Sequence, residues 1–137
     1  MVSVYVWYLR RSLERSLPHL PYFGHSSMFV NGAAGRFYIS WWPAERDYQH
    51  ARYAGRAKHH ENLEKDIQEE GARPDYAITL TGLDEAKIAS FWQNLKLQDV
   101  WGLFKLNCAT TVAYALRVGG GKTYAPTWEN KFASPKF

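Results

Sequence analysis

The feature of the sequence that most restricts the fold is a pair of β-prone runs separated by turn residues. The runs are His25 to Val30 and Arg36 to Trp42, and the segment between them contains Asn31-Gly32 and Gly35. Such residues favour the tight connection of an antiparallel hairpin. We therefore expect two adjacent antiparallel strands, with the second ending at Pro43, because proline cannot donate a hydrogen bond to a central strand.

Periodicity predicts two more strands and a helix. Val2 to Leu9 alternates aliphatic and aromatic residues, and Tyr76 to Leu80 is a short β-prone run. A stretch that Thr81 or Asp84 could cap follows the second run. Its apolar residues have the i, i+3, i+4 and i+7 spacing of an amphipathic helix, and they are Ile88, Phe91, Trp92 and Leu95.

A second amphipathic helix is predicted near the end of the chain. It begins at Cys108 and ends at the glycines 119–121, which cannot sustain it. One stripe of this helix carries the apolar residues Cys108, Val112, Ala115 and Leu116. By contrast, the segment from Ala44 to Asp75 carries mixed charge and few residues that could fill a core. We expect it to be a solvated insertion, helical around Glu61 to Glu70.

Length and composition fit one folded domain. The chain has 137 residues, of which 46% are hydrophobic and 16% aromatic, enough for a core without disulfides or a structural metal. Together with the predicted elements, this indicates an α+β domain over residues 1–137. The expected architecture is an antiparallel sheet on which the Cys108 helix packs.

The net charge of the chain restricts the classes of possible partner only slightly. A net charge of +4 permits attraction to anionic lipid, nucleic acid or an acidic protein. The mixed charge of the segment from Ala44 to Asp75 argues against a dedicated nucleic-acid surface. The first residues place an apolar run before the arginines, unlike a signal peptide, and no run approaches the roughly 18 apolar residues of a membrane span. We expect a soluble protein without a signal peptide or transmembrane segment.

Cys108 is the one cysteine of the chain, and its position indicates chemistry. It opens a predicted helix, where backbone N–H groups and the helix dipole stabilise a thiolate. Reactive thiolates usually have a cationic partner, and His25 at the start of a predicted strand is the candidate. An inert core thiol is the alternative reading of a single cysteine.

Two local contexts together resemble a known family. "GHSSMFVNG" followed by "YISWWP", and later "LNCATTVAYAL", are similar to the circularly permuted branch of the papain-like fold. That branch contains NlpC-like hydrolases and relatives of lecithin:retinol acyltransferase, in which the histidine strand precedes the cysteine helix. The resemblance covers roughly Tyr22 to Trp42 and Tyr76 to Gly121.

The resemblance implies roles for particular residues. Cys108 would be the nucleophile and His25 the base, while a polar residue on the next strand would orient the imidazole. With the hairpin turn near Gly32 and Ala33, the register brings His25 opposite Ser40 or Trp41, and Ser40 is our candidate for this third role. Relatives of lecithin:retinol acyltransferase usually have a second histidine there, which this hairpin lacks.

Asn107 and the N–H of Cys108 are candidate donors to an oxyanion, with a simple helix cap as the alternative role for Asn107. Trp41 and Trp42 are candidates for a substrate-contacting surface. We expect aromatic residues at such spacing to be core, with one of these two facing outward because successive strand residues point to opposite sides.

Two other motifs carry no function in our reading. The run Gly119 to Thr123 ends a helix, whereas a phosphate loop begins one. His59 and His60 lack the spacing of a zinc site. We expect no metal and no cofactor.

The function expected from these features is cysteine-dependent acyl transfer through a thioester. Basic charge and aromatic richness favour phospholipid deacylation with peripheral membrane contact, and amide hydrolysis of peptidoglycan or protein is the alternative. A non-catalytic interaction module is a third reading. By analogy, small domains of this kind also resemble bacterial effector toxins that a secretion system delivers into a target cell and that an immunity protein inhibits.

Overall fold

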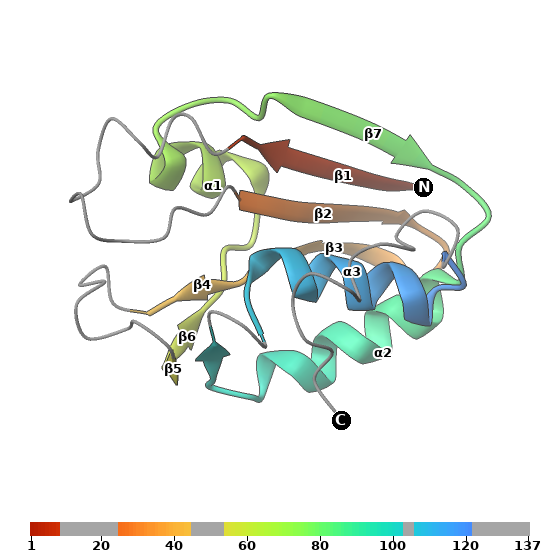
Figure 1. Cartoon of the computed structure of the whole chain (residues 1–137). Coiled ribbons are helices and arrows are strands. Elements are labelled where there is room, and N and C mark those ends of the chain that lie inside the picture. Colours follow the sequence, from red (N-terminus) through yellow and green to blue (C-terminus); the bar gives the residue numbers. More distant parts are fainter. Residues whose placement is uncertain (9–24, 45–53, 103–105, 122–137) are drawn as a thin grey trace.

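The computed structural model describes residues 1–8, 25–44, 54–102 and 106–121. Within these residues the fold is α+β, with an antiparallel sheet and helices on both of its faces (Figure 1). The strand order of the sheet is β3-β2-β1-β7. Its strands are β1 (Val2–Trp7), β2 (His25–Gly32), β3 (Gly35–Ile39) and β7 (Tyr76–Leu80).

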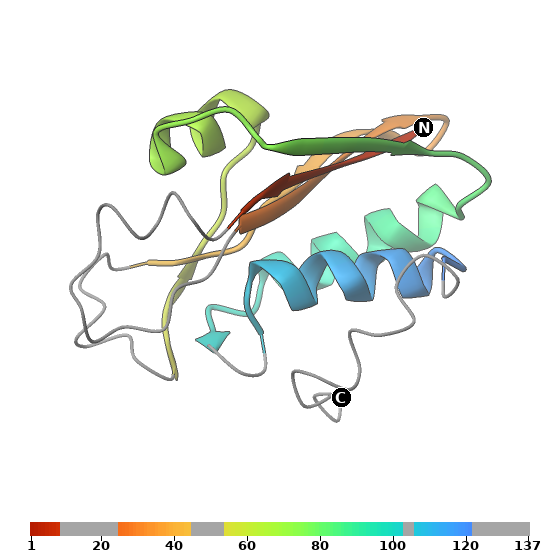
Figure 2. The same cartoon turned by 45° about the horizontal axis from the view of Figure 1, so that its top comes forward.

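The helices lie on opposite sides of the sheet. Two of them, α2 (Glu85–Lys96) and α3 (Cys108–Val118), cover one face, as Figure 2 shows. The short helix α1 (Leu63–Glu70) lies against one end of the other face. The longest of these helices has 12 residues. None of the helices in the described ranges is long and apolar enough to cross a membrane.

Two short ladders extend the fold beyond the main sheet. One pairs β4 (Trp42–Pro43) with β6 (Ala57–Lys58), and the other pairs β5 (Ala54–Gly55) with β8 (Trp101–Gly102). The second β-prone run of the sequence is therefore split between β3 and β4. Leu9, predicted as the end of the first strand, lies outside the described residues.

The four strands predicted from the sequence are confirmed as the main sheet, but the hairpin register differs. Gly32 pairs with Gly35, so the turn is centred one residue later than predicted. Met28 pairs with Ile39 at the last position of the ladder. Extending that register places His25 opposite Trp42 rather than Ser40 or Trp41, because moving the centre of a turn by one residue moves each cross-strand partner by two.

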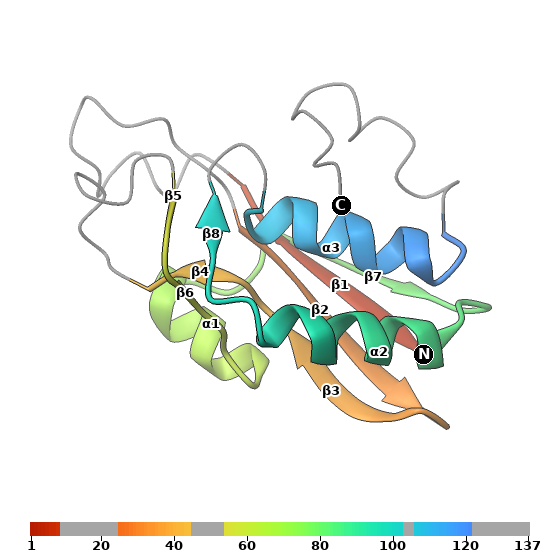
Figure 3. The ribbon, with the colours of Figure 1, turned by 90° about the horizontal axis from the view of Figure 1, so that it is seen from below.

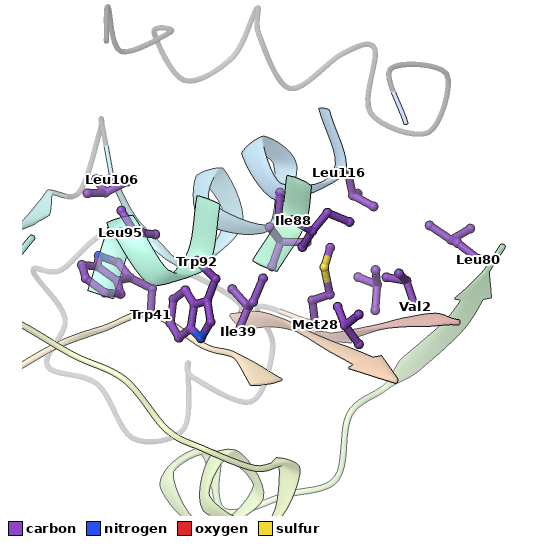
Figure 4. Packing of buried hydrophobic residues seen from close by; sticks show 14 of the residues in the cluster. Val2, Met28, Ile39, Trp41, Leu80, Ile88, Trp92, Leu95, Leu106 and Leu116 are labelled. Atoms are coloured by element: carbon purple, nitrogen blue, oxygen red, sulfur yellow. The ribbon is translucent and has the colours of Figure 1, made fainter. Parts of the chain in front are cut away.

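The core lies between the sheet and the helices α2 and α3. Alternate residues of each strand face these helices, as a strand requires. Figure 4 shows Met28 and Ile39 of the sheet facing Ile88 and Trp92 of α2. The stripe predicted for α3 is buried, and Leu116 lies at its far end. The side chain of Asp84 caps α2 by accepting the backbone N–H of Lys87 at 3.1 Å, as one of the two predicted caps.

The predicted insertion contributes more than a solvated loop. Its helix is confirmed as α1, capped by Asn62, whose side chain accepts the backbone N–H of Lys65 at 3.0 Å. The expectation of a solvated helix is wrong at Asp66, whose side chain is fully buried. Mixed charge predicts a solvated segment only if the fold offers no hydrogen-bond donors to a buried carboxylate. Here the sheet supplies such donors to Asp66.

The core between α2 and the sheet predicts the effect of a cavity. Ile88 has no exposed surface, and Ile88→Ala should lower the free energy of unfolding by about 2–5 kcal/mol, measured by urea denaturation. Leu97→Ala, just past the end of the same helix at 81% exposure, is the control and should change stability by less than about 0.5 kcal/mol. Equal losses in the two variants would contradict this packing.

Candidate active site

The structure brings together the two residues on which the sequence analysis centred. Cys108 is the first residue of α3, and His25 is the first residue of β2. Figure 3 shows the start of α3 beside the start of β2. The imidazole of His25 makes a hydrogen bond with the Cys108 side chain. Both side chains are buried, at 9% exposure for Cys108 and 4% for His25.

A carboxylate binds the other side of the imidazole. Nε2 of His25 lies 3.0 Å from Oδ2 of Asp66, on α1. Because Nε2 is occupied by the carboxylate, Nδ1 is the ring nitrogen left for Cys108. Three side chains from three separate elements therefore form a thiol–imidazole–carboxylate series, the arrangement in which a carboxylate orients a base toward a nucleophile.

Three further donors surround the Asp66 carboxylate. Tyr38 Oη donates to Oδ2 at 2.6 Å, and Ser40 Oγ donates to Oδ1 at 2.7 Å. Trp42 Nε1 also donates to Oδ1, at 2.8 Å. Burial opposes the charge of Asp66, but its hydrogen bonds with His25, Tyr38 and Ser40 outweigh burial and hold the pKa of this carboxyl below its usual range. The carboxylate is therefore ionised and fixed in place.

His25 is held in its protonated form by the same neighbours. Burial alone would lower the pKa of His25, but the hydrogen bonds to Asp66 and Cys108 and their charges raise it to about 10. The ring is consequently an imidazolium at neutral pH. A cation therefore lies beside the Cys108 side chain at the start of α3.

Aromatic rings fix the plane of the imidazole. The Trp42 ring stacks on His25 with 4.1 Å between centroids and an interplanar angle of 29°. Trp7 lies on the other strand beside it, at 5.1 Å and 43°. Trp42 thus contacts both the imidazole of His25, by stacking, and the carboxylate of Asp66, by its indole N–H.

Trp41 and Trp42 point to opposite faces, as predicted, but neither faces solvent. Trp41 packs edge-on against Trp92 in the core, and Trp42 turns toward His25. Their exposures are 2% and 9%, so the expectation that one of them faces outward is wrong. Strand alternation gives the side of the sheet, but it cannot tell that α1 closes this end of the outer face.

Asn107 is the cap of α3. Its Oδ1 accepts the backbone N–H of Thr110 at 2.9 Å, and the Thr110 hydroxyl accepts the backbone N–H of Asn107 at 2.9 Å. This reciprocal pair is a capping box that fixes the start of the helix and with it the position of Cys108. The structure therefore shows the cap role that the sequence analysis considered beside the oxyanion role.

Ser40 and Asp66 divide the role that the sequence analysis gave to Ser40. The residue at the imidazole Nε2 is Asp66, which uses its Oδ2 there. Ser40 donates to the other carboxylate oxygen, Oδ1. Sequence reasoning missed Asp66 because it lies in a run of charged residues near a helix N-terminus. An acidic residue is favourable there for electrostatic reasons alone, so its identity carries no sign of burial.

The motifs set aside in the sequence have structural roles. Gly119 caps α3, and the backbone N–H of Gly121 donates to the carbonyl of Leu116 at 2.7 Å. His59 lies edge-on to Trp92, and His60 lies near Trp42. Within the described ranges, no three His, Cys, Asp or Glu side chains gather where they could hold a metal ion.

Comparison of the chain with protein-family models, with curated proteins and with solved structures gave no match.

The raised pKa of His25 predicts how stability depends on pH. The native state keeps the His25 proton up to about pH 10, whereas the unfolded chain releases it near 6.5. This contribution is fully present below pH 6.5 and is lost as pH rises toward 10. Urea denaturation from pH 6 to 10 should show the loss. It should be smaller in Asp66→Asn, which lacks the charge that holds the proton, and equal pH dependence in both proteins would contradict the assignment.

Proposed function

We propose that this protein is a cysteine-dependent acyl hydrolase or acyltransferase in which Cys108 is the nucleophile. The observation that carries the proposal is the buried imidazole of His25, which bonds Cys108 on one side and Asp66 on the other. An ion pair of this kind activates a thiol at neutral pH. The α3 packing on β2 and the order of histidine strand before cysteine helix support a permuted papain-like fold.

The chemistry follows from the charges at the site. The Cys108 thiolate adds to a carbonyl carbon, and the negative charge that develops on the carbonyl oxygen faces the start of α3. The His25 imidazolium then protonates the leaving group as the bond to it breaks, which yields a thioester. Neutral His25 next takes a proton from water or another acceptor, whose attack on the thioester releases the acyl group.

Asp66 keeps the imidazole in one orientation and one tautomer throughout these steps. Because the carboxylate stays ionised, it stabilises the imidazolium each time the proton returns to the ring. Ser40, Tyr38 and Trp42 hold the carboxylate, so they act on the reaction through Asp66.

For the substrate, we propose acyl esters of anionic phospholipid. The net charge of +4 favours an anionic surface. Tyr8 and Tyr76 are about half exposed, and the strand register places them at the same end of the sheet as His25. Exposed tyrosines at this end of the sheet suit a membrane interface, a role for which the buried Trp41 and Trp42 do not qualify.

Cys108→Ala should abolish acyl transfer and leave the fold intact, because the change removes one sulfur and little packing. The assay is release of free fatty acid or lysophospholipid from anionic phospholipid vesicles. A peptidoglycan-derived amide serves as the second substrate. Cleavage of the amide with the lipid untouched would replace lipid deacylation by amide hydrolysis.

Iodoacetamide provides a test that needs no substrate. Cys108 of the native protein should be alkylated well below pH 8, as followed by mass spectrometry, because its thiolate is paired with His25. Alkylation only above pH 8 would overturn the proposal in favour of an interaction module. Activity retained in Cys108→Ala would instead show that Cys108 is not the nucleophile.

Asp66→Asn should lower kcat by at least about a hundredfold, because the ring loses its charged orienting partner. Ser40→Ala should lower it far less, since Tyr38, Trp42 and His25 still bind the carboxylate. Steady-state kinetics of the two variants measure the difference. A Ser40→Ala loss as large as that of Cys108→Ala would give Ser40 a more direct role than support of Asp66.

A further inference from the structure

Ser26 is a buried serine next to the catalytic base. It follows His25 in β2, pairs with Val6 of β1 and is 3% exposed. Successive strand residues face opposite sides, so Ser26 lies on the same side of β2 as Met28, the side that α2 and α3 cover. The start of α3 lies beside the start of β2 in every view (Figures 1 to 3). Ser26 therefore lies on the side of the strand where Cys108 opens its helix.

The hydroxyl of Ser26 has no hydrogen-bond partner among the described residues. Its Oγ therefore makes no hydrogen bond with the Cys108 sulfur. The two other buried serines of the hairpin are both satisfied, since Ser27 bonds Tyr38 and Ser40 bonds Asp66. A buried hydroxyl without a partner costs about 1–3 kcal/mol, so its presence beside His25 calls for a reason.

We propose that Ser26 is a catalytic residue whose Oγ–H donates a hydrogen bond to the carbonyl oxygen of the acyl substrate. The inference rests on the proposed function. A substrate carbonyl that reaches Cys108 arrives at the junction of β2 and α3, where Ser26 has a donor to offer. The acceptor that the hydroxyl lacks in the free protein is then supplied by the substrate.

Asn107 fixes the helix start that lies on the same side of β2 as Ser26. The Oδ1 of Asn107 is committed to the backbone of Thr110, and its backbone N–H is bound by the Thr110 hydroxyl. These bonds hold Asn107 to its structural role at the helix start. A hydroxyl of β2 that faces the start of α3 adds to the effect of the helix dipole. The negative charge that develops on the carbonyl oxygen is then stabilised by both elements.

The bonding changes in the step are the following. As the Cys108 sulfur forms its bond to the carbonyl carbon, the π electrons of the C=O bond move to the oxygen. Ser26 keeps its proton throughout and strengthens its hydrogen bond as that oxygen becomes negative. When the carbonyl re-forms, the bond to the leaving group breaks, and that group takes its proton from His25.

The test compares activity and stability in Ser26→Ala. With p-nitrophenyl butyrate as the acyl probe, kcat/KM should fall by roughly 10²-fold, the scale of one lost oxyanion donor. The free energy of unfolding should stay the same or rise, because the substitution removes an unsatisfied buried hydroxyl. Alkylation of Cys108 by iodoacetamide should keep its native rate, since that reaction displaces iodide and develops no oxyanion.

Ser27→Ala is the matched control, a neighbouring serine that is fully buried but bonded to Tyr38. It should lose stability, whereas Ser26→Ala should not. Native kcat/KM in Ser26→Ala would overturn the role of Ser26, and so would a loss of activity accompanied by losses of stability and alkylation rate. If the native protein itself were alkylated only above pH 8, the proposed function would fail first, and the role of Ser26 would fall with it.

Discussion

The site depends on the burial of one carboxylate. Asp66 has no exposed surface, and an ionised carboxyl in such a place is stable only when donors replace the lost water. The described residues provide four, from an imidazole, a phenol, a hydroxyl and an indole. The donors come from β2, β3 and the residues that follow β3, so the hairpin and α1 are held in one arrangement by a polar cluster. The charge on Asp66 in turn helps to keep His25 protonated beside Cys108, the nucleophile of the proposed function.

This polar cluster and the apolar core occupy opposite faces of the same strands. Met28 and Ile39 face α2 and α3, while Ser27 and Tyr38, one residue earlier on each strand, face the side of α1. The Asp66 cluster therefore rests on strands whose other face is already packed, and Cys108 belongs to α3 on that other face. Such support fixes the positions of the reacting groups more firmly than loops would.

Much of this arrangement could be predicted from the sequence because it depends on local periodicity. The four strands of the main sheet, the helix after Asp84 and the helix start at Cys108 all follow from alternation, helical spacing and caps. The register of the hairpin could not be predicted in this way. It depends on which two residues form the turn, and several residues of that segment could form one. Asp66 could not be recognised for a different reason: its partners lie far away in the chain, and its neighbours in sequence are charged residues of the kind that surround a solvated helix.

The attachment of α1 determines the fraction of molecules in which the site is complete. Asp66 is the buried residue of this helix, so the interaction that fastens α1 to the sheet is the one that completes the site. Any local opening that lifts α1 removes the carboxylate from His25 while the main sheet and α3 stay folded. Under the proposed function, the fraction of molecules competent for catalysis is the fraction with α1 in place, and the observed rate is the intrinsic rate multiplied by that fraction.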